Sequence, residues 1–140
     1  ALRAQDLALG AWALAAWGYE SGSDDTGLAS FAAAAASRGA ELNARDVANT
    51  VWAMAAQALV DELSICSLAS HAQRTLPEME LQHLCNVLWA FATFSWSHAG
   101  GPAILRGVSA ALLRKRPGDF HECGLAAASW ALADALSQSK

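Results

Sequence analysis

The sequence predicts an all-α protein in which about three and a half helical hairpins repeat along the chain as an α-solenoid. Composition is the first reason: alanine, which has the highest intrinsic helix propensity, makes up about a quarter of the chain. The second reason is a tryptophan followed by Ala-[Leu/Met/Phe]-Ala, which returns at intervals of 40, 37 and 41 residues. A period of this size is typical of stacked helical units. The four tryptophans are Trp12, Trp52, Trp89 and Trp130.

The repeat extends upstream of each tryptophan. An apolar residue stands ten positions before it, at Leu2, Leu42, Met79 and Phe120, and another five positions before it, at Leu7, Val47, Leu84 and Leu125. We therefore divide the chain into one array with repeats at about 1–39, 40–77 and 78–117, followed by a half repeat at 118–140. Each tryptophan segment is predicted to be the first helix of its unit.

The first unit is predicted to hold helices at about 3–17 and 28–37. Gly18 and the polar loop at 20–27 separate them, because this loop is rich in residues that favour turns. Gly39 is expected to end the second helix. The alanines of the second helix offer little side-chain area, so we expect it to pack very close to its neighbours.

The second unit is predicted to open at Asn43, whose side chain can cap free backbone amides, with Asp46 placed three residues later near the positive end of the helix dipole. This first helix is expected to end near Leu59. Asp61 is predicted to cap the second helix, and Pro77 to close it.

The third unit is predicted to hold a helix at about 80–94 and a second helix that starts at Pro102 and ends before Pro117. Asp119 and Glu122 resemble a capping box for the first helix of the last half repeat. That helix remains apolar and has no second helix after it. We therefore expect its exposed face to be covered by further repeats or by a partner.

The formal net charge of −4 is unevenly distributed. Residues 1–100 carry four basic and ten acidic groups, whereas residues 101–140 carry five basic and three acidic groups. Nucleic-acid binding draws much of its affinity from neutralised phosphates, so this balance argues against a binding surface that covers the whole protein. The one basic cluster either contacts phosphate or complements a helix dipole; it consists of Arg106, Arg114, Lys115 and Arg116.

Other chemistries find little support in the sequence. The longest uncharged apolar run, residues 7–19, is too short for a membrane span, so none is predicted. His83-x-Cys85 and His121-x-Cys123 fall at different positions of their repeats and lack a second ligand pair, so no metal site is predicted. No glycine-rich phosphate loop or recognisable catalytic arrangement is present, so we expect neither a cofactor nor enzymatic activity.

The segments LNARDVANTVWAMA (42–55) and MELQHLCNVLWAFA (79–92) resemble the octotricopeptide repeat family of helical hairpins. The second unit fits the family motif best, whereas the first replaces its Asn-Thr pair by Leu9-Gly10 and the fourth by Ala127-Ala128. The resemblance implies a protein of a mitochondrion or chloroplast that acts on organellar RNA. It would then be a subunit of a ribonucleoprotein such as an organellar ribosome.

In related helical-repeat families, side chains of the first helices read one nucleotide per repeat. Seven residues before each tryptophan, the candidates for RNA contact are Gln5, Arg45, Gln82 and Cys123. Six residues before it they are Asp6, Asp46, His83 and Gly124. A solvated helix start is the alternative explanation for the variation at this second position.

Two further repeat positions have competing interpretations. Each tryptophan has a small residue four positions before it and an alanine three positions after it, so we predict packing in the core rather than stacking on bases. Asn49 and Asn86, three residues before their tryptophans, bond either a base edge or the backbone of a neighbouring repeat. Trp17 and Trp96, outside the repeat position, are candidates for exposed contacts.

Two functions follow from these patterns. The first is a non-catalytic organellar module that binds RNA. The alternative is a protein-interaction scaffold within a large organellar complex, which the acidic balance and the alanine content favour. A positive surface that contains Arg45, Arg74, Arg106 and Arg114 would support RNA, whereas scattering of these residues would undercut it.

Overall fold

The computed structural model of the chain describes residues 2–17, 27–94 and 101–115, and these residues are helical with short connections. The helices are α1 (Ala4–Ala16), α2 (Gly27–Ser37), α3 (Ala44–Ala56), α4 (Glu62–Thr75), α5 (Leu81–Thr93) and α6 (Gly101–Leu113). Two short 3-10 helices, η1 (Gly39–Glu41) and η2 (Leu76–Glu78), follow α2 and α4. The prediction of an all-α protein is therefore confirmed for the described residues. None of their helices is long and apolar enough to cross a membrane.

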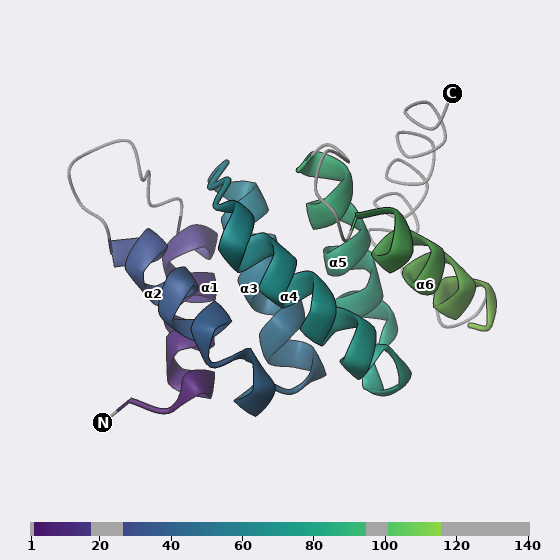
Figure 1. Cartoon of the computed structure of the whole chain (residues 1–140), viewed down its shortest axis with the longest axis horizontal. Coiled ribbons are helices and arrows are strands. Elements are labelled where there is room, and N and C mark those ends of the chain that lie inside the picture. The colour runs from purple at the N-terminus through teal and green to yellow at the C-terminus, as the bar shows by residue number, and fades with distance from the viewer. Residues whose placement is uncertain (1, 18–26, 95–100, 116–140) are drawn as a thin grey trace.

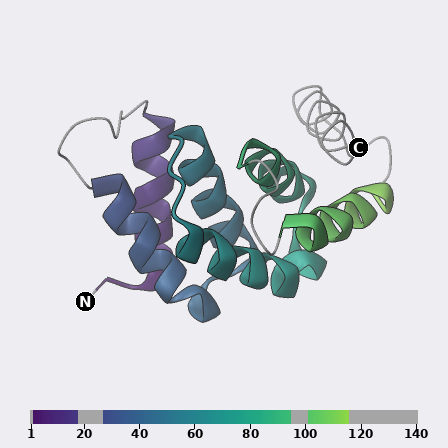
Figure 2. The same ribbon diagram turned by 45° about the horizontal axis from the view of Figure 1, so that its top comes forward.

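The helices form two rows that lie against each other (Figure 1). α1 packs against α3 and α3 against α5, which makes a first row; α2 packs against α4 and α4 against α6, which makes a second row. Each helix of the first row also contacts the helix that follows it in the chain. Figure 2 shows the same arrangement from another side, with the chain advancing from α1 and α2 towards α6.

The first-row helices begin in the same way. At N3, the third helical position, an acceptor bonds the backbone N–H of the N-cap residue: Asp6 bonds Arg3 at 3.1 Å, Asp46 bonds Asn43 at 3.3 Å, and His83 bonds Glu80 at 3.2 Å. This satisfies one of the backbone amides that a helix start leaves unpaired. The predicted cap at Asn43 is confirmed, because its side chain accepts the N–H of Asp46 at 2.9 Å.

The second-row helix α4 has the predicted cap as well. Asp61 accepts the backbone N–H of Ser64 at 3.2 Å and also bonds its hydroxyl group. The cap predicted at Asp119 and Glu122 lies outside the described residues, as does the whole half repeat at 118–140.

The apolar residues five positions before each tryptophan lie in the core between the rows. Leu7, Val47 and Leu84 are buried. The small residues four positions before and three positions after each tryptophan are buried too, which brings the helix backbones close together; they are Ala8, Ala48, Cys85, Ala15, Ala55 and Ala92. These small residues carry the close packing that the alanine content predicted.

The tryptophans themselves are not the centre of this core. The prediction of a core position is wrong for Trp12, whose side chain is 38% exposed. Trp52 and Trp89 are half-buried and pack against the edge of the core. The reason is geometric: the small residues occupy the inward side of each helix, which turns the tryptophan towards the rim. Trp130 and Trp96 lie outside the described residues, while Trp17 is 91% exposed, as its place at a helix end predicted.

The end of α3 differs from the prediction by three residues. Helix α3 ends at Ala56 rather than near Leu59, because Ala58 adopts a positive φ of 52°. The N–H of Leu59 then bonds the carbonyl of Met54 at 2.8 Å, and that of Ala58 bonds Ala55 at 3.1 Å. These two bonds are the Schellman arrangement that closes many helices, although glycine usually occupies the left-handed position.

Candidate nucleic-acid interface

One line of side chains on each first-row helix lies at the edge of the core or outside it. Its members stand seven and three positions before the tryptophan, at the tryptophan, and four positions after it, so they share one helix face. In α1 the line is Gln5, Leu9, Trp12 and Ala16; in α3 it is Arg45, Asn49, Trp52 and Ala56; in α5 it is Gln82, Asn86, Trp89 and Thr93. All twelve side chains are exposed or half-buried. We call this surface the tryptophan–amide face.

The tryptophans of neighbouring helices meet on this face. The ring centroids of Trp52 and Trp89 lie 6.5 Å apart, with their planes tilted by 39°. An intercalated base requires about 6.8 Å between two parallel rings, which is twice the rise of a stacked strand. Because their planes are tilted by 39°, the two rings do not form a parallel-sided slot for a base; we call this pair of neighbouring rings the aromatic strip.

Amide groups lie beside this strip in α5. The Nε2 of Gln82 donates to the Oδ1 of Asn86 at 3.0 Å, one turn further along the helix. In α3 the equivalent positions hold Arg45 and the half-buried Asn49. The face therefore carries hydrogen-bonding groups without a carboxylate among its own members.

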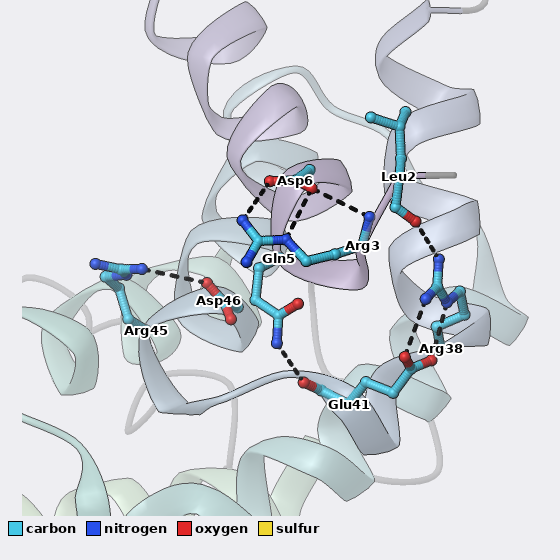
Figure 3. Close-up of polar contacts among 8 residues, drawn as sticks. All are labelled: Leu2, Arg3, Gln5, Asp6, Arg38, Glu41, Arg45 and Asp46. Carbon is cyan, nitrogen blue, oxygen red and sulfur yellow. Dashed lines mark hydrogen bonds and ion pairs between the residues drawn. The ribbon is translucent and has the colours of Figure 1, made fainter.

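The residues six positions before each tryptophan have a structural role at the helix starts, and RNA contact by Asp6 or His83 stays a prediction. Asp6, Asp46 and His83 are the N3 residues that bond the first backbone N–H of each helix. Asp46 is only 3% exposed, so its prediction as an exposed candidate is wrong. Asp6 also pairs with Arg3 at 3.1 Å, as Figure 3 shows. A helix start explains these three side chains fully.

The residues seven positions before each tryptophan differ among the units. Gln5 donates through Nε2 to the backbone carbonyl of Glu41 at 2.9 Å, so it links the first unit to the second (Figure 3). Arg45 has a side chain that is 65% exposed, with one Nη2 atom 3.8 Å from Asp46 Oδ1. Gln82 is exposed. Cys123 and Gly124, the candidates of the fourth unit, lie outside the described residues.

Basic side chains near the ends of the second-row helices close each unit. They bond the carbonyl of the residue just before the N-cap of the first helix of the same unit. Arg38 donates to Leu2 at 2.7 Å, Arg74 to Leu42 at 3.3 Å, and Lys115 to Met79 at 3.5 Å. We call these three bonds the hairpin clasps. Sequence reasoning missed them, although a basic residue 26, 22 and 26 positions after each tryptophan was the available signal.

Two of the clasps have additional partners. Arg38 pairs with both carboxylate oxygens of Glu41 at 2.9 Å (Figure 3). Because Arg38 is already paired, it needs no external anion. Its hydrogen bonds to Glu41 lower the pKa of that carboxyl group. Arg74 also donates to the carbonyl of Gly39 at 3.2 Å. These cations hold backbone groups in place.

The arginines that an RNA-binding surface was predicted to bring together are distributed over three helices and their ends. Arg45 lies on the first-row helix α3, whereas Arg74 is at the end of α4. Arg106 is exposed on α6 and Arg114 follows that helix. Of the predicted basic cluster, Lys115 belongs to a clasp and Arg116 lies outside the described residues. Because Arg74 and Lys115 are engaged by backbone carbonyls, fewer cations remain for phosphates, which weakens a mode of binding driven by phosphates.

Two histidines have a lowered pKa. Burial lowers the pKa of His83, the Arg45 guanidinium lowers it further, and the carboxylate of Glu80 opposes both. Burial also lowers the pKa of His71, with a second contribution from Arg74. Among the described residues, no group of three His, Cys, Asp or Glu side chains is arranged to hold a metal ion.

Comparison of the chain with protein-family models, curated proteins and solved structures finds no match to any of them.

Proposed function

We propose that this chain is an α-solenoid module of helical-hairpin repeats that binds single-stranded RNA, without catalysis, through the tryptophan–amide face. Two rows of helices that advance unit by unit support the solenoid interpretation. The observation that carries the binding proposal is the return of a tryptophan with polar neighbours at the same outward positions in α3 and α5.

The chemistry of this face suits unpaired bases better than a phosphate backbone. Stacking of a base on an aromatic side chain contributes about 1–3 kcal/mol and tolerates any sequence. Amide and guanidinium groups beside the rings supply hydrogen bonds to base edges. Because Arg74 and Lys115 are engaged by backbone carbonyls, most of the affinity comes from bases, and its dependence on salt is shallow for a nucleic-acid-binding protein.

The resemblance to octotricopeptide repeats gives the proposal its biological setting. Under it, the module acts on RNA of a mitochondrion or chloroplast as a subunit of a ribonucleoprotein such as an organellar ribosome. Imaging of the fluorescently tagged full-length protein against organelle markers tests this setting; a cytosolic or nuclear signal contradicts it.

A protein-interaction scaffold is the second candidate, and the engagement of Arg74 and Lys115 by backbone carbonyls favours it. The net charge of −4 and the exposed apolar side chains of Leu2, Leu9 and Trp17 around α1 also suit a protein partner. In this alternative the same tryptophan–amide face packs against a neighbouring subunit.

The test that separates the candidates is fluorescence anisotropy of a labelled single-stranded RNA of mixed sequence and of its duplex. The binding variant is Trp52→Leu/Trp89→Leu, which keeps apolar contact with the core but removes both indole rings. The control variant is Arg106→Ala/Arg114→Ala on and beside α6, and thermal unfolding checks that both variants remain folded.

We expect the protein to bind the single strand more tightly than the duplex. The affinity for the single strand should fall about tenfold or more in the tryptophan variant and change little in the control. Loss of binding only in the arginine variant contradicts the proposed face. If the unmodified protein does not bind RNA at low salt, this segment does not recognise RNA, and the protein-interaction scaffold is favoured.

A further inference from the structure

The three units do not present the same groups on the tryptophan–amide face. In the first unit, Leu9 replaces the asparagine, and the Nε2 of Gln5 already donates to the carbonyl of Glu41 at 2.9 Å. That unit offers Trp12 as a stacking surface with no amide pair beside it. The second and third units keep both the tryptophan and the polar positions, so discrimination between bases resides there.

The third unit presents an oriented pair of amides. Because Asn86 Oδ1 accepts from Gln82 Nε2 at 3.0 Å, the Nδ2 group of Asn86 remains as a donor and the Oε1 of Gln82 as an acceptor. Adenine carries the complementary pair on one edge, with N7 as acceptor and the N6 amino group as donor. Along the helix axis Asn86 stands about 4.5 Å and Gln82 about 10.5 Å from Trp89. The Gln82 side chain reaches Asn86, so an adenine that lies over the ring brings this edge first to Asn86 and then to Gln82.

The second unit presents donors instead. The guanidinium of Arg45 carries only N–H groups, and its side chain is 65% exposed. Its contact with Asp46 is long, at 3.8 Å, and that carboxylate already bonds the backbone N–H of Asn43. Guanine offers two acceptors, O6 and N7, which an arginine engages together.

We propose that the second and third units bind two adjacent purines: a guanine whose edge faces Arg45 over Trp52, and an adenine whose edge faces Gln82 and Asn86 over Trp89. This inference rests on the proposed function, since it names the RNA that the same face selects. The rings of Trp52 and Trp89, with centroids 6.5 Å apart, place the two bases side by side on one strip.

The test uses labelled octamers of uridine with GA, AG, AA or UU at the centre, titrated with the whole chain at low salt. Both orders of guanine and adenine are included because the strand runs in one direction across the face. We expect one of GA and AG to bind about tenfold more tightly than UU.

The variant Arg45→Gln gives the second unit the same residue pair as the third, Gln followed four positions later by Asn. It is expected to move the preference from the guanine-containing octamer to AA, by about fivefold or more. Arg106→Gln on α6 is the matched control and should leave the order of affinities unchanged. Arg45 is exposed, and thermal unfolding verifies that its replacement leaves the fold intact.

Equal affinity for all octamers, or an unchanged preference in Arg45→Gln, overturns the purine assignment while the RNA-binding function stands. Absence of binding to every octamer, with no effect of Trp52→Leu/Trp89→Leu on any RNA, overturns the proposed function itself.

Discussion

Single basic side chains hold each hairpin closed. Arg38, Arg74 and Lys115 stand near the ends of the second-row helices and bond carbonyls before the first-row helices. Such bonds are charge-assisted, so they contribute more than neutral hydrogen bonds of the same length. The consequence for function is that these cations belong to the fold, and removing them lowers stability before it alters binding.

Arg74→Met tests a clasp directly. It removes the donors to Gly39 and Leu42 but keeps an apolar stem of similar length. We expect the free energy of unfolding in urea to fall by about 1 kcal/mol or more. Arg106→Met on α6 is the matched control and should stay within about 0.5 kcal/mol of the unmodified protein. Equal stability of the two variants would show that the clasp contributes nothing.

His83 makes stability depend on pH. Its Nδ1 accepts the N–H of Glu80, which a protonated imidazole cannot do, and burial lowers its pKa in the folded chain. The unfolded chain therefore takes up a proton first, and the free energy of unfolding falls as pH drops through about 6.5. His71, whose pKa is also lowered, acts in the same direction.

Urea unfolding at pH 7.5 and 5.5 measures this dependence. In His83→Gln the replacement accepts the same N–H but does not titrate in this range, so the loss of stability between the two pH values should be smaller than in the unmodified protein. A loss of the same size would exclude His83 as a contributor.

At the scale of elements, the sequence predicted the order of helices well and their ends less well. The caps at Asn43 and Asp61 could be predicted because each side chain bonds a backbone N–H only three residues further along the chain. The end of α3 was not, because it depends on a left-handed alanine at Ala58, and no local preference predicts that conformation for a residue with a Cβ atom.

Ala58→Gly and Ala56→Gly are expected to change stability in opposite directions. At Ala58 glycine relieves the cost of φ 52°, which should raise the free energy of unfolding by up to about 1 kcal/mol. At Ala56, the last residue of α3, glycine replaces a residue of high helix propensity, so the free energy of unfolding should fall by about 0.5–1 kcal/mol. Thermal or urea unfolding of the two variants checks both signs; destabilisation by both would contradict the closing role of Ala58.

At the scale of the whole molecule, the described helices form two rows, and equivalent sequence positions of α1, α3 and α5 lie outside the core or at its edge. The periodicity predicted which residues occupy equivalent positions on the first helices. Gln5, Arg45 and Gln82 are one such set, each near the start of its helix. The periodicity did not show which faces point outward. Because small residues stand four positions before and three positions after each tryptophan, the tryptophans were assigned to the core, whereas these buried small residues occupy the inward side themselves.

The residues six positions before each tryptophan were ambiguous in the sequence for a related reason. A varying polar residue near a helix start suits both a reading position and a cap, and only the backbone distances to Asp6, Asp46 and His83 distinguish these roles. The clasps join residues more than thirty positions apart. The basic residues that recur 22 or 26 positions after the tryptophans mark one partner of each clasp, but a single sequence does not show which carbonyl that partner bonds.

The most direct test of the tryptophan–amide face is nuclear magnetic resonance of the indole N–H groups in the 15N-labelled chain, which contains six tryptophans. Single Trp→Phe variants assign the signals, and an unlabelled RNA octamer that binds in anisotropy is then added to saturation. We predict that the signals of Trp52 and Trp89 shift, while that of Trp17, 91% exposed but outside the face, stays in place. Saturation without a change at Trp52 or Trp89 would contradict the account.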